Sequence, residues 1–150
     1  MTRAALGLLL AWGLGCAHWP PGVPRVASCP GPLVDAAAIP GGDFLLRERA
    51  RVDGPGAAVS LALTVERRGD RLVLVAIDPF GARAFSVVQT GMDLEIDDRM
   101  GRAGSLDPAT LLADLHAARF SRPDSEERAV VARPGCEHTT TFVRTERRAL

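Results

Sequence analysis

Alternating apolar and polar residues at positions 59–66 constrain the fold of this chain most strongly. Apolar side chains occupy every second position there, with small or polar side chains between them. A period of two is typical of a β-strand with one buried and one solvated face. The run at residues 72–77 is apolar throughout, which predicts a central strand covered on both sides.

Other short segments fit the same pattern, and turn residues separate them. The turn at residues 78–81 reads Asp-Pro-Phe-Gly, with Pro at its second position and Gly at its fourth, as suits a type I turn. Consecutive strands at this spacing predict an antiparallel meander. The further strands are expected at residues 44–52, 84–89, 92–96, 128–133 and 139–144.

One helix is signalled by its ends. Asp107 is the expected N-cap and Pro108 the first helical residue. The helix should end near Phe120, because a proline follows at position 123. We expect His116 to be half exposed beside the apolar stripe, and the Arg119 stem to lie along that stripe with its guanidinium reaching solvent.

The N-terminus carries a short cationic start followed by apolar residues 4–15. That run is too short to span a bilayer, which takes about 20 residues, and matches a secretory signal peptide. Gly13-Leu14-Gly15 before Cys16 resembles the lipobox of bacterial lipoproteins, in which the cysteine is acylated and becomes the mature N-terminus. The alternatives are ordinary cleavage after Ala17, giving a secreted or soluble periplasmic protein, and an uncleaved anchor.

These signals predict three parts of the chain. Residues 1–15 are expected to be the signal peptide, and residues 16–32 a lipidated Cys16 with a Pro-rich, semi-rigid tether. Residues 33–150 are expected to be one β-rich domain. Ala17 is not the Asp that resembles an inner-membrane retention signal, so we expect anchoring at the periplasmic face of the outer membrane.

If Cys16 is acylated or removed by cleavage, two of the three cysteines remain, which is an even number. Outside the cytoplasm, Cys29 and Cys136 are expected to form a disulfide between the start of the domain and its last segment. One alternative is a pair of unbonded buried thiols. Another is a zinc site formed by these thiols and His138, but we expect no metal.

Charge and motifs narrow the class of function. The 18 basic and 18 acidic residues balance, and loss of Arg3 with the signal leaves 17 and 18, so nucleic acid is not an expected partner. The chain lacks Gly-x-Ser-x-Gly, His-Glu-x-x-His, Cys-x-x-Cys and a phosphate loop. We therefore expect no enzyme and no cofactor, with an envelope enzyme that uses His116 and His138 as the alternative.

Residues 71–87 resemble the strand, Pro-x-Gly turn and strand of LolB-like outer-membrane lipoproteins. They are more similar to a group of short, uncharacterised bacterial lipoproteins related to LolB, some of them associated with aryl-polyene biosynthesis. Leu111-Leu112-Ala113-Asp114-Leu115 fits the helix that follows in that group, and the resemblance covers roughly residues 44–120. It implies an α+β, mainly β fold: a curved antiparallel sheet, or half-barrel, with one main helix packed on its concave side.

The resemblance also implies a ligand. In LolA and LolB the concave cavity receives the acyl chains of lipoproteins, so an acyl chain, a polyene chain or a lipoprotein lipid tail is the expected ligand. In the alternative, the same side chains form a packed core, and the protein is a structural or accessory envelope lipoprotein with an unidentified protein partner. The candidate lining residues are Val59, Leu61, Leu63, Leu72, Leu74, Phe85, Val87, Leu111 and Leu115.

Overall fold

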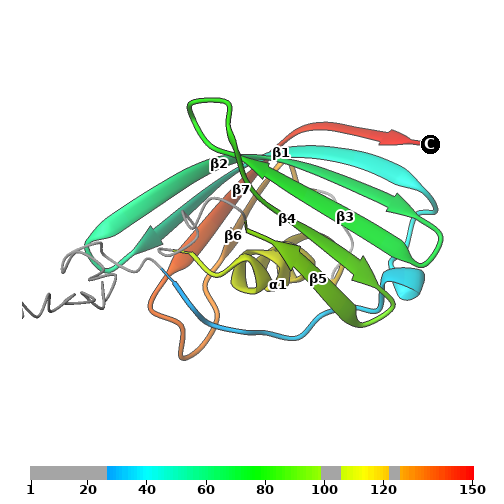
Figure 1. Ribbon diagram of the computed structural model, residues 1–150. Helices are drawn as coiled ribbons and strands as arrows, with labels where there is room; N and C mark the ends of the chain where they lie inside the picture. The colour runs from blue at the N-terminus through cyan, green and yellow to red at the C-terminus, as the bar shows by residue number, and fades with distance from the viewer. Residues whose placement is uncertain (1–26, 99–105, 122–125) are drawn as a thin grey trace, which may run out of the picture.

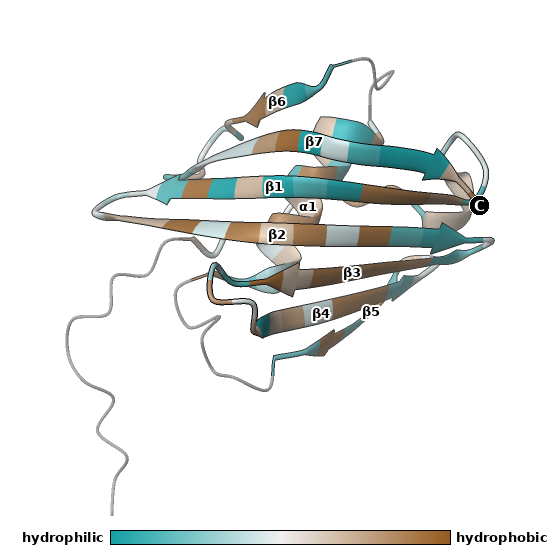
Figure 2. Ribbon diagram, turned by 90° about the horizontal axis from the view of Figure 1, so that it is seen from above, coloured by the Kyte–Doolittle hydropathy of each residue, from teal (hydrophilic) through white to brown (hydrophobic). Residues whose placement is uncertain are grey.

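Seven antiparallel strands form one open, curved sheet with an α-helix on its concave side (Figure 1). The computed structural model describes residues 27–98, 106–121 and 126–150. Along the sheet the order is β5-β4-β3-β2-β1-β7-β6, as the view from above shows (Figure 2). The elements are η1 (Ala36–Ala38), β1 (Phe44–Gly54), β2 (Ala57–Arg68), β3 (Arg71–Ile77), β4 (Arg83–Thr90), β5 (Asp93–Asp97), α1 (Pro108–Arg119), β6 (Arg128–Val131) and β7 (Thr139–Ala149).

The predicted meander is confirmed for the first five strands, which pair in chain order. The turn between β3 and β4 closes with a hydrogen bond from the Gly81 N–H to the Asp78 carbonyl, at 3.0 Å. The last strand returns to the first: β7 pairs with β1 from Phe44↔Ala149 to Asp53↔Thr139. Because β7 joins β1 and not β5, the sheet stays open, with β5 and β6 at its edges.

The alternation in the sequence separates the two faces of the sheet. Along β2, Leu61 and Leu63 are buried on the concave face, whereas Ser60 and Ala62 are exposed on the convex face. Figure 2 shows the same alternation as bands of hydropathy along β1 and β2. This arrangement confirms the mainly β fold with a curved antiparallel sheet and a helix on its concave side.

The prediction that the apolar third strand is covered on both sides was wrong. Its concave residues, Leu72 among them, are buried, but Val73, Val75 and Ile77 on the convex face are only partly buried. These side chains lie on the same face as those of neighbouring strands, as the pairing Val73↔Val88 shows, and not beneath a second layer. Cross-strand contacts between β-branched residues are sufficient to favour such a run in a strand.

The helix forms where its end signals predict. The Asp107 carboxylate accepts a hydrogen bond from the Ala109 N–H at 3.0 Å, Pro108 starts the helix, and Phe120 is its C-cap. Nearly every residue of α1 is buried, and the helix packs against β4, β6 and β7. None of the helices in the described ranges is long and apolar enough to cross a membrane.

The segment before β1 also belongs to the fold. Ala27 pairs with Leu106, and the Gln89 side chain donates to the Val34 carbonyl at 2.8 Å. Arg67 donates to the carbonyls of three residues around η1, which are Ala36, Ala37 and Gly42. Together with α1 this segment covers the concave face (Figure 1). Residues 27–32, assigned to the tether from sequence, are therefore held against the domain.

Candidate functional site

The nine candidate lining residues lie in the core between the concave face of the sheet and α1. Eight of them are 0–6% exposed, and Val59 is partly buried. They belong to one continuous cluster that also contains Phe44 and Phe142. In this conformation the side chains of the sheet and of α1 fill the concave side together, which is the packed-core arrangement.

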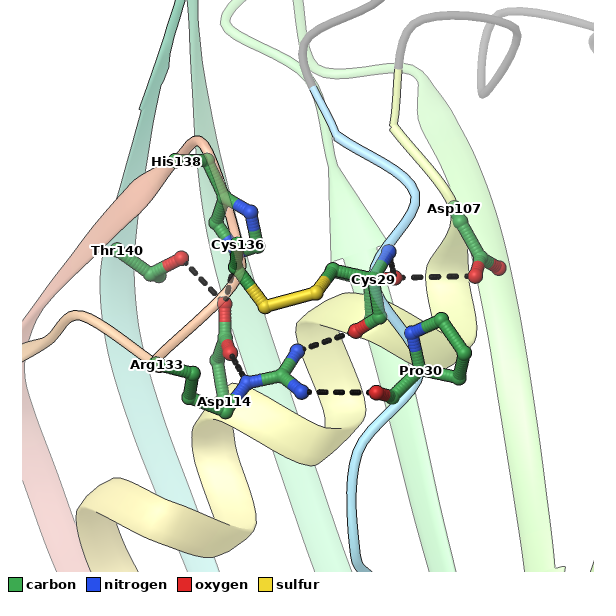
Figure 3. A network of polar contacts seen from close by, with 9 residues as sticks. Cys29, Pro30, Asp107, Asp114, Arg133, Cys136, His138 and Thr140 are labelled. Carbon is green, nitrogen blue, oxygen red and sulfur yellow. Dashed lines mark hydrogen bonds and ion pairs between the residues drawn. A yellow bond between two sulfur atoms is a disulfide. The ribbon is translucent and has the colours of Figure 1, made fainter.

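The predicted disulfide is present. Cys29 and Cys136 are bonded, with their Cα atoms 5.9 Å apart (Figure 3). The Cys29 N–H also donates to the Thr110 hydroxyl at 2.8 Å, so the bridge joins the N-terminal segment both to α1 and to the β6–β7 connection. The disulfide uses both thiols of the alternative zinc site. Among the described residues, no three His, Cys, Asp or Glu side chains are grouped to hold a metal ion.

A buried carboxylate on α1 organises the polar contacts around this bridge. Asp114 is 1% exposed and accepts from Arg133 Nε and the Thr140 hydroxyl, both at 2.6 Å. It also pairs with His138 Nε2 at 2.8 Å (Figure 3). Arg133 in turn donates to the carbonyls of Cys29 and Pro30. One aspartate thereby connects the helix, β7 and the N-terminal segment.

The far end of α1 is held by a second buried ion pair. Arg119 Nε donates to Glu48 Oε1, and both side chains are at most 1% exposed. The guanidinium also donates to the carbonyls of Glu126 at 2.6 Å and Glu127 at 3.1 Å. The expectation that Arg119 reaches solvent was therefore wrong. Its buried partner, Glu48, belongs to β1. The sequence around the helix gives no indication of this pairing, because the two residues are 71 positions apart.

His116 is fully buried, which corrects the expectation of half exposure. The Val34 N–H donates to its Nδ1 at 2.9 Å, and its ring meets the Phe120 ring edge-on, with centroids 5.0 Å apart. Because Nδ1 accepts a hydrogen bond, the neutral ring carries its proton on Nε2. Burial lowers the His116 pKa to about 4. At neutral pH this histidine is an uncharged packing residue that holds the N-terminal segment on α1.

The convex face carries a groove of about 630 Å³. Most of its wall is apolar, and the β3–β4 turn rises beside it on the side away from α1 (Figure 1). Such a volume lies within the range of small-molecule sites. The lining residues with side chains on this face are Arg49, Arg51, Ser60, Ala62, Arg128, Thr141 and Val143, and Asp78, Pro79 and Gly81 line it from the turn.

The arginines of this groove are not among the site residues predicted from the sequence. Arg49 and Arg51 stand two residues apart on β1, and Arg128 begins β6. The alternation of charged and apolar residues along β1 places such residues on one face. That pattern could have revealed a charged stripe, but only the pairing of β1 with β7 and of β7 with β6 brings Arg128 to it.

Residues 46–149 match the model of the protein family DUF3261, which is described as 'protein of unknown function'. The chain belongs to the DUF3261 family. No curated protein matches the chain.

The DUF3261 match contains the groove residues, α1 and nearly all of the sheet. Cys136 lies inside the matched region, whereas Cys29 precedes it. The disulfide thus attaches a segment outside the match to the DUF3261 domain.

Proposed function

We propose that this DUF3261 protein is a cell-envelope lipoprotein that binds a hydrophobic chain, and that the convex groove receives it. The ligand class is the one that the resemblance to LolB-like lipoproteins implies: an acyl chain, a polyene chain or the lipid tail of a lipoprotein. The observation that carries the proposal is the groove of about 630 Å³ with its mainly apolar wall. Sites of this size and lining bind small ligands by burying their apolar surface.

The groove is a better candidate site than the concave side. A chain between the sheet and α1 would have to displace side chains that are 0–6% exposed. It would also separate α1 from Glu48 on β1, from Thr140 on β7 and from His138, which precedes β7. Breaking one buried ion pair costs about 3–5 kcal/mol. A ligand on the convex face disturbs none of these contacts.

The envelope location rests on the first sixteen residues, which lie outside the described residues, and on the disulfide. A Cys29–Cys136 bridge suits an oxidising compartment. We propose that an acylated Cys16 anchors the protein at the periplasmic face of the outer membrane, and that its role there is binding without catalysis. The open antiparallel sheet with a helix on its concave side supports a relationship to LolB-like lipoproteins and their aryl-polyene-associated group.

The packed concave core also supports the alternative of an accessory lipoprotein that contacts a protein partner and has no ligand. Cross-linking in intact cells separates the two functions. The accessory role requires one stable protein partner that is recovered whether or not the groove is blocked. The binding role requires that blocking the groove removes the bound lipid.

The direct test blocks the groove. Ala62 is exposed, lies on the convex face and lines the groove, so Ala62→Trp should fill it. Ala58→Trp, on the same face of β2 but outside the groove, is the matched control. Titration with a fluorescent acyl probe should show binding to wild type and Ala58→Trp, and at least a tenfold loss in Ala62→Trp. Equal binding by all three proteins would reject the groove as the site.

A further inference from the structure

Two arginines of the convex groove lie in one row across neighbouring strands. Arg49 on β1 pairs with Val143 on β7, and Val143 pairs with Arg128 on β6. Neighbouring strands are about 4.8 Å apart, so the two arginine Cα atoms are separated by about 10 Å. Directly paired residues point to the same face of a sheet. The Arg49 and Arg128 side chains therefore lie on either side of Val143 on the convex face, and both are exposed.

These two guanidinium groups differ from other arginines of the same face. Arg51 pairs with Asp53 at 2.9 Å, and Arg47 pairs with Glu146 at 3.2 Å. Within the ranges that the structure describes, neither Arg49 nor Arg128 makes a side-chain hydrogen bond or ion pair.

Among the described residues that line the groove, Asp78 is the one carboxylate, and it accepts hydrogen bonds within its own turn. Asp78 Oδ1 accepts from the N–H groups of Phe80 and Ala82, both at 2.9 Å. The other charged lining residues are Arg49, Arg51 and Arg128, and among the described residues only Arg51 of these three has a carboxylate partner.

As far as β3 the same row is apolar, and at β4 it reaches Arg83, which pairs with Ile77 and forms an ion pair with Asp97. From Arg49 it continues to Ala62 on β2 and to Ile77 on β3. Pro79 and Gly81 of the β3–β4 turn form the adjacent wall. Toward β6 the groove thus has two cationic side chains with no partner among the described residues, and toward β3 it is lined by Ala62 and by Pro79 of the turn.

We propose that the groove binds a single-chain amphiphile with an anionic head, a carboxylate or a phosphate. The head lies between Arg49 and Arg128, and the chain runs over Ala62 toward the β3–β4 turn. Guanidinium groups bind both anions through paired, charge-assisted hydrogen bonds. This inference rests on the proposed function and adds the chemistry and the direction of the ligand.

The test compares probes that share one chain and differ in the head: decanoate, decyl phosphate, decanol and decylammonium. Calorimetric titration would use the full chain with Cys16→Ala, which removes the predicted acyl anchor. We expect both anions to bind at least about tenfold more tightly than decanol, and decylammonium to bind most weakly. The double variant Arg49→Gln/Arg128→Gln should lose that preference and bind the anions no better than decanol.

The control variant is Arg47→Gln/Arg71→Gln, which changes the net charge equally at two exposed arginines outside the groove. It should keep the wild-type preference, and near-identical far-UV spectra and melting temperatures should show that both variants fold. If decanoate and decanol bind equally to wild type, or if both double variants behave alike, the anionic head is rejected and the hydrophobic site stands. If no ten-carbon probe binds, the proposed function fails as well.

Discussion

The two faces of the sheet are organised in opposite ways. On the concave face, α1 and the N-terminal segment cover the strands, and charged groups such as Glu48, Asp114 and Arg119 are buried with partners from distant parts of the chain. On the convex face, arginines are exposed, and Arg49 and Arg128 have no partner in the described part of the chain.

This difference indicates a division of roles between the two faces. Buried ion pairs are strongly coupled to folding because removal of one partner leaves a charge in a poorly solvated place. Exposed pairs contribute little, since water screens them. The concave face should therefore determine stability, and the convex face should tolerate substitution and is available for binding.

The largest effect is expected at the Glu48–Arg119 pair. Glu48→Gln removes the negative partner of a fully buried guanidinium, and should lower the free energy of unfolding by about 3–5 kcal/mol. Asp53→Asn, which removes the exposed partner of Arg51, should cost less than about 1 kcal/mol. Urea unfolding of both variants measures the difference. Similar losses in the two would mean that the faces do not differ as described.

Loss of the disulfide should have the next largest effect. The bridge spans 107 residues, and removing a native disulfide from a small domain costs about 2–5 kcal/mol. The double variant Cys29→Ser/Cys136→Ser should therefore unfold at a lower urea concentration than wild type. Thiol titration of the unfolded, unreduced wild type provides the check on the bond: two reactive thiols from Cys29 and Cys136 would show that it does not form in the mature protein.

His116 should make stability depend on pH. Its pKa is lowered from 6.5 to about 4 in the folded protein, so the unfolded chain binds the proton more readily between these values. The stabilisation is fully present above about pH 6.5 and should fall by about 3 kcal/mol as the pH is lowered to 4. His116→Asn keeps an acceptor for the Val34 N–H and should flatten this part of the profile. If the free energy of unfolding of the variant depends on pH as steeply as that of wild type, groups other than His116 are responsible for the pH dependence.

The smallest effect on stability is expected on the convex face. Arg49→Gln/Arg128→Gln should change the free energy of unfolding by less than about 0.5 kcal/mol, because both side chains are exposed and make no described polar contact. Thermal unfolding of this double variant and of Glu48→Gln, each compared with wild type, measures the two stability losses. A loss above 2 kcal/mol would show that the convex arginines have a structural role and that the two faces do not differ in their contribution to stability.

Local patterns in the sequence were sufficient to predict the strands and α1, but they did not indicate η1. The alternation in β2, the turn at residues 78–81 and the Asp107-Pro108 start of α1 are all present in the structure. Each depends on the preferences of a few adjacent residues, so each can be read without knowing what packs against it. The Cys29–Cys136 bond was predictable from counting, since one pair remained once Cys16 was assigned to lipidation.

How these elements pack together could not be predicted from local patterns. Glu48 and Arg119 are 71 residues apart, and no local pattern indicates that β7 returns to β1 or that a helix arginine is paired under the sheet. The same holds for the convex groove, because Arg49 and Arg128 share a row only through the register of three strands. The strands, α1 and the cysteine pair could be predicted from the sequence alone, because short-range backbone preferences and residue counts specify them. Long-range pairing decided which charges are buried with partners and which remain exposed, because burial depends on elements that lie far apart in the chain.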